Sequence, residues 1–300
     1  MKKNTKQVIF IIGPTAIGKT SLAIKLAKAI KCEIISCDSR QFYKELKIGT
    51  APPSTEELAE VKHHFIQNLS IKDNYNAGEF ELDALNKIEE LHKKNNSVIV
   101  VGGSGLYINA ICKGFDKIPK VSSTNREWAI NLYKKNGLDW LQKEVKTIDP
   151  YFYAHNDIQN PNRLLRQLEV FKQTGEPVSK FKSNTIKKRH FKILKIGLNM
   201  QRSLLYDRIN KRVDTMIRSG LLDEVKSLLN YKDFNAMQTV GYKELIMFLE
   251  KKISLDQAIE NMKKNTRRFA KRQLTWFRKD KEIKWIQNNE LSETLNIISK

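Results

Sequence analysis

Short apolar runs alternate along the chain with segments whose apolar residues recur every three or four positions. Four runs rich in β-branched residues predict strands: Val8–Ile12, Glu33–Ser36, Val98–Val101 and Phe191–Leu198. Between the strands, Ser21–Ile30 and Glu79–Lys94 show helical periodicity, and Asn76 forms a capping-box pattern with Glu79. Strands that alternate with helices predict an α/β fold, in which a parallel sheet is flanked by helices.

The pattern changes in the middle of the chain. From Pro119 onward, turn signals such as Asn136-Gly137 separate segments of helical periodicity. Residues 119–190 carry fourteen Lys and Arg against seven Asp and Glu, a net charge of +7. After the strand Phe191–Leu198 the periodicity is helical to Phe277. We therefore predict a core built from residues 1–118 and 189–300, with a helical C-terminal part, interrupted by a basic helical insertion at 119–188.

The first predicted strand runs into a glycine-bracketed loop, GPTAIGKT. A strand, the pattern G-x-x-x-x-G-K-[S/T] and a helix are typical of a P-loop. Its glycines let backbone N–H groups turn inward around phosphate oxygens, and its lysine adds positive charge. The hydroxyl of Thr20 is placed to bind Mg²⁺. We predict that the loop binds a diphosphate or nucleotide through Gly13, Pro14, Thr15, Ala16, Ile17, Gly18, Lys19 and Thr20.

The loop does not specify a reaction. An ATPase usually adds an apolar strand that ends in a metal-binding acid, whereas Val98–Val101 leads into Gly102-Gly103-Ser104-Gly105. The strand that does lead to an acid is Glu33–Ser36, which is followed by Asp38. Because the carboxyl ends of parallel strands face the ligand crevice, Asp38 is a candidate general base beside the loop. It fits equally well as a cap of the next helix or as a ligand that holds Mg²⁺ through water.

The net charge of +21 and the pI near 9.7 indicate a polyanionic partner, nucleic acid first. A composition rich in Lys is the alternative cause. The three cysteines have neither metal-site spacing nor an even number, which fits reduced thiols. No apolar run approaches the roughly 20 residues of a membrane helix. We expect a cytoplasmic monomer that does not associate with membranes.

The segment Lys263–Lys284 carries ten Lys and Arg against two acids, a net charge of +8. Three of its cations lie near one face of a helix: Arg268, Arg272 and Lys279. This face either binds RNA or is simply solvated. The aromatic residues Phe269, Trp276 and Phe277 either pack inward or stack on bases, and we expect Trp276 to belong to the core.

Two further pairs leave alternatives open. Arg208 and Arg212 face the same way on a predicted helix, and they fit a clamp on diphosphate or RNA as well as ion pairs with Asp207, Asp214 or Glu224. His63 and His64 lack a partner at metal-ligand spacing, so we expect structural or RNA-facing roles for both.

Several short motifs follow one another along almost the whole chain. Besides the P-loop they are DSRQFY at Asp38–Tyr43, IGTAPP at Ile48–Pro53, His63-His64, YNAGEFELDA at Tyr75–Ala84, VGGSGLY at Val101–Tyr107, NRLLRQLEV at Asn162–Val170, AMQTVGYKE at Ala236–Glu244 and KRQLTWFR at Lys271–Arg278. Taken together they resemble the tRNA dimethylallyltransferase family, also called tRNA isopentenyltransferases. So many motifs in the right order make the resemblance specific.

The resemblance implies a reaction. The dimethylallyl group moves from dimethylallyl diphosphate to N6 of the adenine just 3′ of the anticodon, so that the loop grips a leaving diphosphate. Lys19, the loop N–H groups and Mg²⁺ at Thr20 would stabilise the developing negative charge. The family assigns Asp38 the role of general base for N6. By its position in the loop, Thr15 would lie near the bridging oxygen.

The resemblance also implies that the target adenine is extracted from the anticodon arm of tRNA. The positions that match tRNA contacts of the family are Asp38, Ser39, Arg40, Gln41, Ser104, Arg126, Asn162, Arg163, Leu164, Leu165, Arg166, Lys271, Arg272, Gln273 and Arg278. Three residues depart from the common pattern: Ile17 replaces Ser, Ser104 replaces Thr and Asn162 replaces Gln.

Two other functions compete with this reading. A P-loop kinase of a small molecule or nucleoside would use the same loop with ATP as donor, but it explains neither the charge nor the helical insertion. A non-catalytic RNA-binding protein would use a nucleotide only as a structural ligand.

Overall fold

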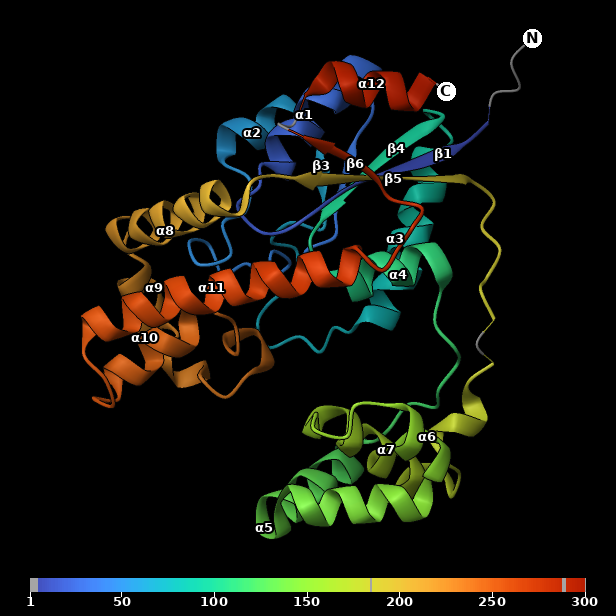
Figure 1. Ribbon diagram of the computed structural model, residues 1–300, viewed down its shortest axis with the longest axis vertical. Helices are drawn as coiled ribbons and strands as arrows, with labels where there is room; N and C mark the ends of the chain where they lie inside the picture. The colour runs from blue at the N-terminus through green and yellow to red at the C-terminus, as the bar shows by residue number, and fades with distance from the viewer. Residues whose placement is uncertain (1–4, 184, 288–289, 300) are drawn as a thin grey trace. The chain divides into compact units, whose positions relative to one another are not determined.

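The computed structural model describes residues 5–183, 185–287 and 290–299, which divide into two compact units (Figure 1). One unit combines Met1–Lys113 with Lys188–Lys300, and the other is the insertion Gly114–Lys187, against the predicted bounds 119–188. None of the described helices combines the length and the hydropathy of a membrane span.

A parallel sheet of six strands forms the centre of the first unit, in the order β3-β2-β4-β1-β5-β6. Its strands are β1 (Gln7–Ile12), β2 (Ile34–Ser36), β3 (His63–His64), β4 (Ser97–Gly102), β5 (Lys192–Asn199) and β6 (Lys284–Gln287). The α/β prediction and its four strands are confirmed. The edge strands β3 and β6 were not predicted, because each is too short and polar to produce an apolar run.

Helices cover both faces of this sheet. The first unit contains α1 (Lys19–Ile30), α2 (Thr55–Glu60), α3 (Ala77–Leu91), α4 (Gly105–Lys113), α8 (Arg202–Arg218), α9 (Leu221–Ser227), α10 (Tyr242–Leu249), α11 (Leu255–Phe277), α12 (Leu291–Ser299) and short 3₁₀ turns at Leu229–Tyr231 and Asn235–Met237. Figure 1 shows α1 and α12 on one face and α3 and α4 on the other. Side chains of β1 alternate accordingly: Ile9 and Ile11 pack with α1, while Phe10 and Ile12 pack with α3 and α4.

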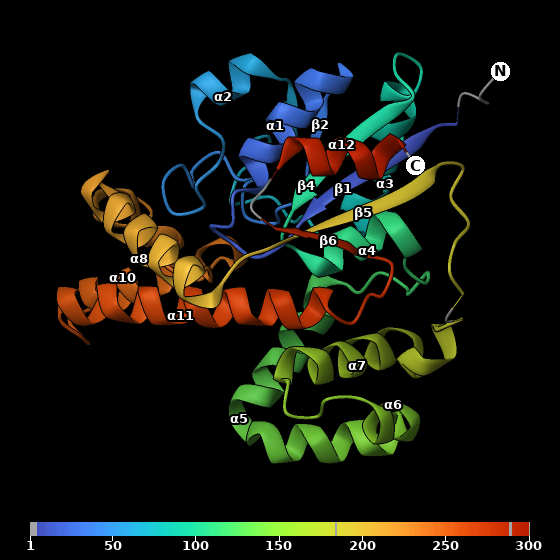
Figure 2. The ribbon, with the colours of Figure 1, turned by 45° about the horizontal axis from the view of Figure 1, so that its top comes forward.

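Beside the sheet, α8, α9, α10 and α11 enclose a third apolar cluster (Figure 2). The carboxylate of Glu224 attaches this cluster to the loop after β2. It accepts hydrogen bonds from the backbone N–H groups of Lys47 (2.9 Å), Ile48 (2.8 Å) and Gly49 (3.2 Å), and from the hydroxyl of the fully buried Tyr242 (2.6 Å). Glu224 therefore acts as a structural acceptor.

The insertion is all helical: α5 (Ser123–Ile148), α6 (Pro150–His155), α7 (Pro161–Thr174) and a 3₁₀ turn at Val178–Phe181. At Gly137 the backbone of α5 is non-helical, with φ 79° and ψ −173°, where Asn136-Gly137 predicted a turn. Buried side chains from all three helices form its core, among them Ala129, Phe152 and Leu168. The carboxylate of Asp149 caps α6 and also accepts the N–H of Ser179.

Replacing Glu224 with Ala should destabilise the fold, because four donors lose their common acceptor. We expect a loss on the order of 3 kcal/mol in the free energy of unfolding, measured as a lower urea midpoint by circular dichroism. Asp223→Ala on the same helix is the matched control, because its side chain is exposed. Equal midpoints for the two variants would contradict the role given to Glu224.

Candidate active site

The predicted P-loop connects β1 to α1 at the carboxyl edge of the sheet. Gly18 precedes the helix in a left-handed conformation, φ 101°, which an L side chain rarely adopts. The first N–H groups of α1 have no acceptor within the helix and so favour an anion. The ammonium of Lys19 folds back over the loop and donates to the carbonyl of Pro14 at 2.8 Å.

Three charged side chains from different parts of the chain interact at this loop: Lys19, Asp38 and Arg212. Burial lowers the pKa of Lys19 to about 8, the carboxylate of Asp38 opposes this shift, and the guanidinium of Arg212 adds to it. Burial also lowers the pKa of Arg212, again opposed by Asp38, while Arg208 adds to the lowering. One carboxylate thus interacts with two cations at this loop, and the excess of positive charge favours a phosphate ligand.

Asp38 is held by the turn that follows β2. The N–H of Cys37 donates to the carbonyl of Val101 on β4 at 2.7 Å, and Asp38 Oδ1 accepts the N–H of Arg40 at 3.0 Å. Next to it, the N–H of Ser39 donates to Ser104 Oγ at 3.3 Å. The alternative that Asp38 caps the next α-helix is wrong, since Ser54 caps α2. The structure therefore brings Asp38, Ser39 and Ser104 together.

The predicted RNA contact Gln273 has a different role. Its side chain is buried, and its Oε1 accepts the N–H of Thr15 in the P-loop at 2.8 Å. Its Nε2 donates to the carbonyl of Gly103 at 2.9 Å. With both ends of the amide used inside the protein, Gln273 joins α11 to the P-loop, a structural role that the sequence did not predict.

Two other predicted contact residues also turn inward. The side chain of Ile17 is buried in the core, so it can offer a phosphate only its backbone. The amide of Gln41 donates to the carbonyl of Ala51 at 2.9 Å, which connects the loop after β2 to the segment IGTAPP. Arg40, in contrast, is partly exposed and donates to the carbonyl of Asn235.

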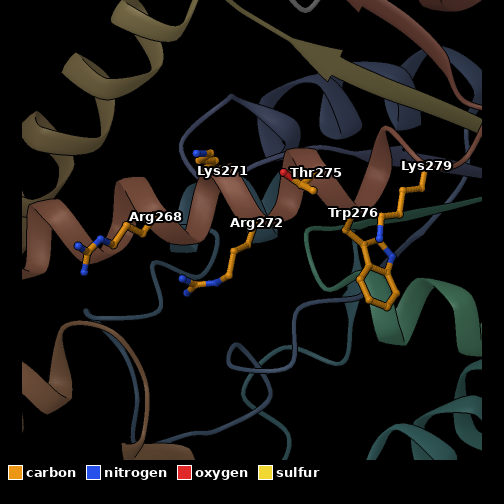
Figure 3. A pocket seen from close by; sticks show the side chains of 6 residues that line it. All are labelled: Arg268, Lys271, Arg272, Thr275, Trp276 and Lys279. Carbon is orange, nitrogen blue, oxygen red and sulfur yellow. The ribbon is translucent and has the colours of Figure 1, made fainter. Parts of the chain in front are cut away.

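One groove of the first unit is lined by the C-terminal half of α11 and by Lys279 just past its end (Figure 3). Its lining residues are Arg268, Lys271, Arg272, Thr275, Trp276 and Lys279. Trp276 is 41% exposed, so its expected place in the core is wrong, while its neighbour Phe277 is buried. Arg278, also predicted to bind RNA, is exposed at the end of the same helix.

The insertion carries the remaining predicted RNA contacts. Arg126, Asn162 and Arg163 are exposed, and Arg166 is half-buried beside Glu169 at 3.7 Å. Leu164 and Leu165 are buried in the core of the insertion, so the prediction that they contact RNA is wrong. Of the predicted RNA contacts in this unit, Arg126, Asn162, Arg163 and Arg166 therefore remain accessible.

The donor set at the P-loop suits a metal that is held mainly by phosphate oxygens. Among the described residues there is no group of three or more His, Cys, Asp or Glu that could hold a metal by itself. Mg²⁺ commonly keeps several waters and takes its remaining ligands from phosphates and one or two side chains, and Thr20 at the start of α1 fits this arrangement. His64 Nε2 lies 2.7 Å from the carboxylate of Glu33, which is a structural role.

Sequence reasoning undervalued two residues at the site. The sequence left open whether Arg212 binds phosphate or pairs with a nearby acid. In the structure two of those acids have other partners, because Asp214 pairs with Lys263 and Glu224 accepts backbone N–H groups. Trp276 was assigned to the core because it is aromatic. The helical spacing of Ala270, Gln273 and Phe277, which form the buried stripe, would have placed Trp276 outside.

Comparisons with known proteins agree on one family. The family model of IPP transferase matches residues 41–280. A tRNA dimethylallyltransferase of Christiangramia forsetii is 54% identical over 96% of this chain and 95% of that protein, and one of Flavobacterium psychrophilum is 48% identical over 97% of each.

Solved structures show the same relationship. The tRNA isopentenylpyrophosphate transferase of Bacillus halodurans is 35% identical, with a TM-score of 0.72 over 98% of this chain and 96% of that one. A eukaryotic dimethylallyltransferase acting on tRNA is 28% identical, with a TM-score of 0.79 over 98% of this chain and 77% of that one. The chain belongs to the IPP transferase family.

Proposed function

We propose that this protein transfers the dimethylallyl group of dimethylallyl diphosphate to N6 of the adenine immediately 3′ of the anticodon in tRNA, with release of diphosphate. The observation that carries the proposal is that the turn of Asp38 is tied to β4 beside the P-loop that holds Lys19, with Asp38 near enough to Lys19 and Arg212 to affect the pKa of both. A carboxylate that faces a cationic cradle suits a reaction in which an amine loses a proton while a diphosphate gains charge. The names of its close relatives support the same reaction.

The cationic side of the site acts on the leaving group. As the allylic C–O bond breaks, its electron pair moves to the diphosphate oxygen. Lys19, Arg212 and the N–H groups at the start of α1 would stabilise this charge where it develops. The N–H of Thr15 is already bound by Gln273, so the loop holds diphosphate through its later N–H groups, with the Thr15 hydroxyl nearer the bridging oxygen.

Asp38 acts on the nucleophile. The N6 nitrogen attacks the allylic carbon, the new N–C bond forms, and one N6 proton passes to the carboxylate of Asp38. The turn that includes the Arg40 N–H orients this carboxylate, and the contact between Ser39 and Ser104 supports the turn from β4. Mg²⁺, held by Thr20 and diphosphate oxygens, would neutralise part of the leaving-group charge.

The RNA would be recognised by separate basic surfaces of the two units. On α11 these are Lys271, Arg272 and Arg278, and on the insertion they are Arg126, Asn162, Arg163 and Arg166. A small-molecule kinase would need neither basic surface. Its relatives would also be kinases, whereas the relatives of this chain are named tRNA dimethylallyltransferases. A non-catalytic RNA-binding role gives no reason for the charged cluster of Asp38, Lys19 and Arg212.

The reaction can be tested directly with Asp38→Asn. Wild-type protein incubated with Mg²⁺, dimethylallyl diphosphate and unmodified tRNA should yield an adenosine heavier by one five-carbon unit, detected by mass spectrometry of digested RNA. Asp38→Asn should slow this transfer at least about 100-fold, because the general base is lost, with nearly normal tRNA affinity. Asp256→Asn, exposed on α11, is the control. An unchanged rate in Asp38→Asn would remove Asp38 from the mechanism.

Lys19 should make donor binding depend on pH. Its pKa of about 8 means that the free protein loses this charge as the pH rises through 8. Affinity for dimethylallyl diphosphate should therefore fall above pH 8, approaching tenfold per pH unit, in calorimetry without tRNA. Lys19→Met should bind weakly with little pH dependence, and Lys25→Met, exposed on the same helix, should behave like wild type. If wild type and Lys19→Met gave parallel pH profiles, the diphosphate would not lie at Lys19.

The basic face of α11 should contribute salt-dependent affinity. Neutralising Arg272 and Arg278 to Gln should reduce the slope of log K against log salt for tRNA by about 0.7 per lost phosphate contact. Lys226→Gln with Lys252→Gln, both exposed elsewhere in the unit, is the matched double control. An identical slope in the Arg272 and Arg278 variant would place the RNA on another surface.

A further inference from the structure

We propose that Trp276 and the cations around it form a stacking subsite for one unpaired nucleotide of the RNA, next in the strand to the nucleotide that is modified. The inference rests on the proposed function and adds a second base-binding position to it. In this subsite Trp276 contacts the base directly, and the flanking cations bind the phosphates.

The shape and charge of the groove fit a nucleotide. Its volume is about 490 Å³, and its lining, all of it among the described residues from Arg268 on α11 to Lys279 just past the helix, has four cationic side chains and no acidic one. Figure 3 shows Arg268, Arg272 and Trp276 projecting from the same side of the helix. An aromatic face among cations is the usual arrangement for a single-stranded nucleotide, because the ring stacks on the base while the cations meet the phosphates.

The indole of Trp276 is held rigidly. Gly105, the first residue of α4, lies directly against it, and a Cβ atom at that position would come within 2.3 Å of the ring. The glycine therefore lets α4 support the indole closely, while the residue as a whole stays 41% exposed. A supported and exposed ring loses little conformational entropy on binding, which favours stacking.

The groove lies close to the reaction centre, because Trp276 is linked to Asp38 by a few neighbouring residues and hydrogen bonds. Gly105 follows Ser104, whose hydroxyl accepts the N–H of Ser39, and Ser39 follows Asp38. One turn earlier on α11 than Trp276, Gln273 binds the P-loop and Gly103. A base on Trp276 therefore lies beside the site of the target adenine, which suits the adjacent nucleotide of an opened loop.

The subsite can be tested by combining variants of Trp276 with RNA hairpins that lack a single base. Anticodon-arm hairpins would be prepared intact and with a single abasic site at each loop position other than the target adenine. Trp276→Leu should weaken binding of intact RNA about tenfold, the scale of one lost base stack, and Trp276→Phe should retain most of the affinity. With the abasic site next to the target adenine, wild type should lose the same factor and Trp276→Leu should lose nothing further.

Phe269→Leu is the matched control, since Phe269 is 37% exposed on the same helix but does not line the groove. Its effect should not depend on the position of the abasic site. A second measurement replaces the neighbouring base with 2-aminopurine, whose fluorescence should be quenched by wild type and not by Trp276→Leu. The proposal is overturned if Trp276→Leu binds intact RNA like wild type, or if its defect persists with every abasic hairpin.

The same samples distinguish a failure of the subsite proposal from a failure of the proposed function. Wild type that failed to prenylate intact tRNA would refute the proposed function. Normal prenylation by wild type, with a Trp276→Leu defect that is independent of the neighbouring base, would refute the subsite alone.

Discussion

The electrostatic interaction of Asp38 with Lys19 and Arg212 is the one on which the rest of the site depends. Each of these groups would be unfavourable if it were buried alone, and together they compensate one another only in part. The remaining positive charge makes the site a receptor for a strong anion. The parallel sheet creates this contact, because the carboxyl ends of β1, β2 and β4 lie at one edge and α8 returns to it after β5.

The same sheet explains how the site is connected to the basic face of α11. In the strand order, β4 lies between β1 and β2, and the segment after β4 touches both sides of the reaction centre. Ser104 supports the turn of Asp38, Gly103 receives Gln273, and Gly105 supports Trp276. One short glycine-rich segment therefore fixes Asp38, the P-loop and α11 relative to one another. These close contacts account for the glycines at a place where an ATPase usually has an acidic residue.

Helix α11 serves two purposes with its two faces. Ala270, Gln273 and Phe277 face inward, and the polar member of this stripe is satisfied by Thr15 and Gly103. The opposite face carries Arg272 and Trp276 toward solvent. A helix that is anchored at the P-loop and carries an exposed basic face would give the two substrates of the proposed reaction a common rigid support.

The sequence by itself determined the features that depend on local patterns: the four inner strands of the parallel sheet, the P-loop, the capped helix at Asn76 and the place of Asp38 after a strand. Tertiary structure decided which way helical side chains face. Gln273 turns inward, Trp276 turns outward, and Leu164 and Leu165 enter the core of the insertion. The burial of one helical face depends on the neighbour that covers it, and that neighbour is distant in sequence. The position of Arg212 beside Lys19 was likewise beyond local patterns, because α8 reaches the P-loop only through the folded sheet.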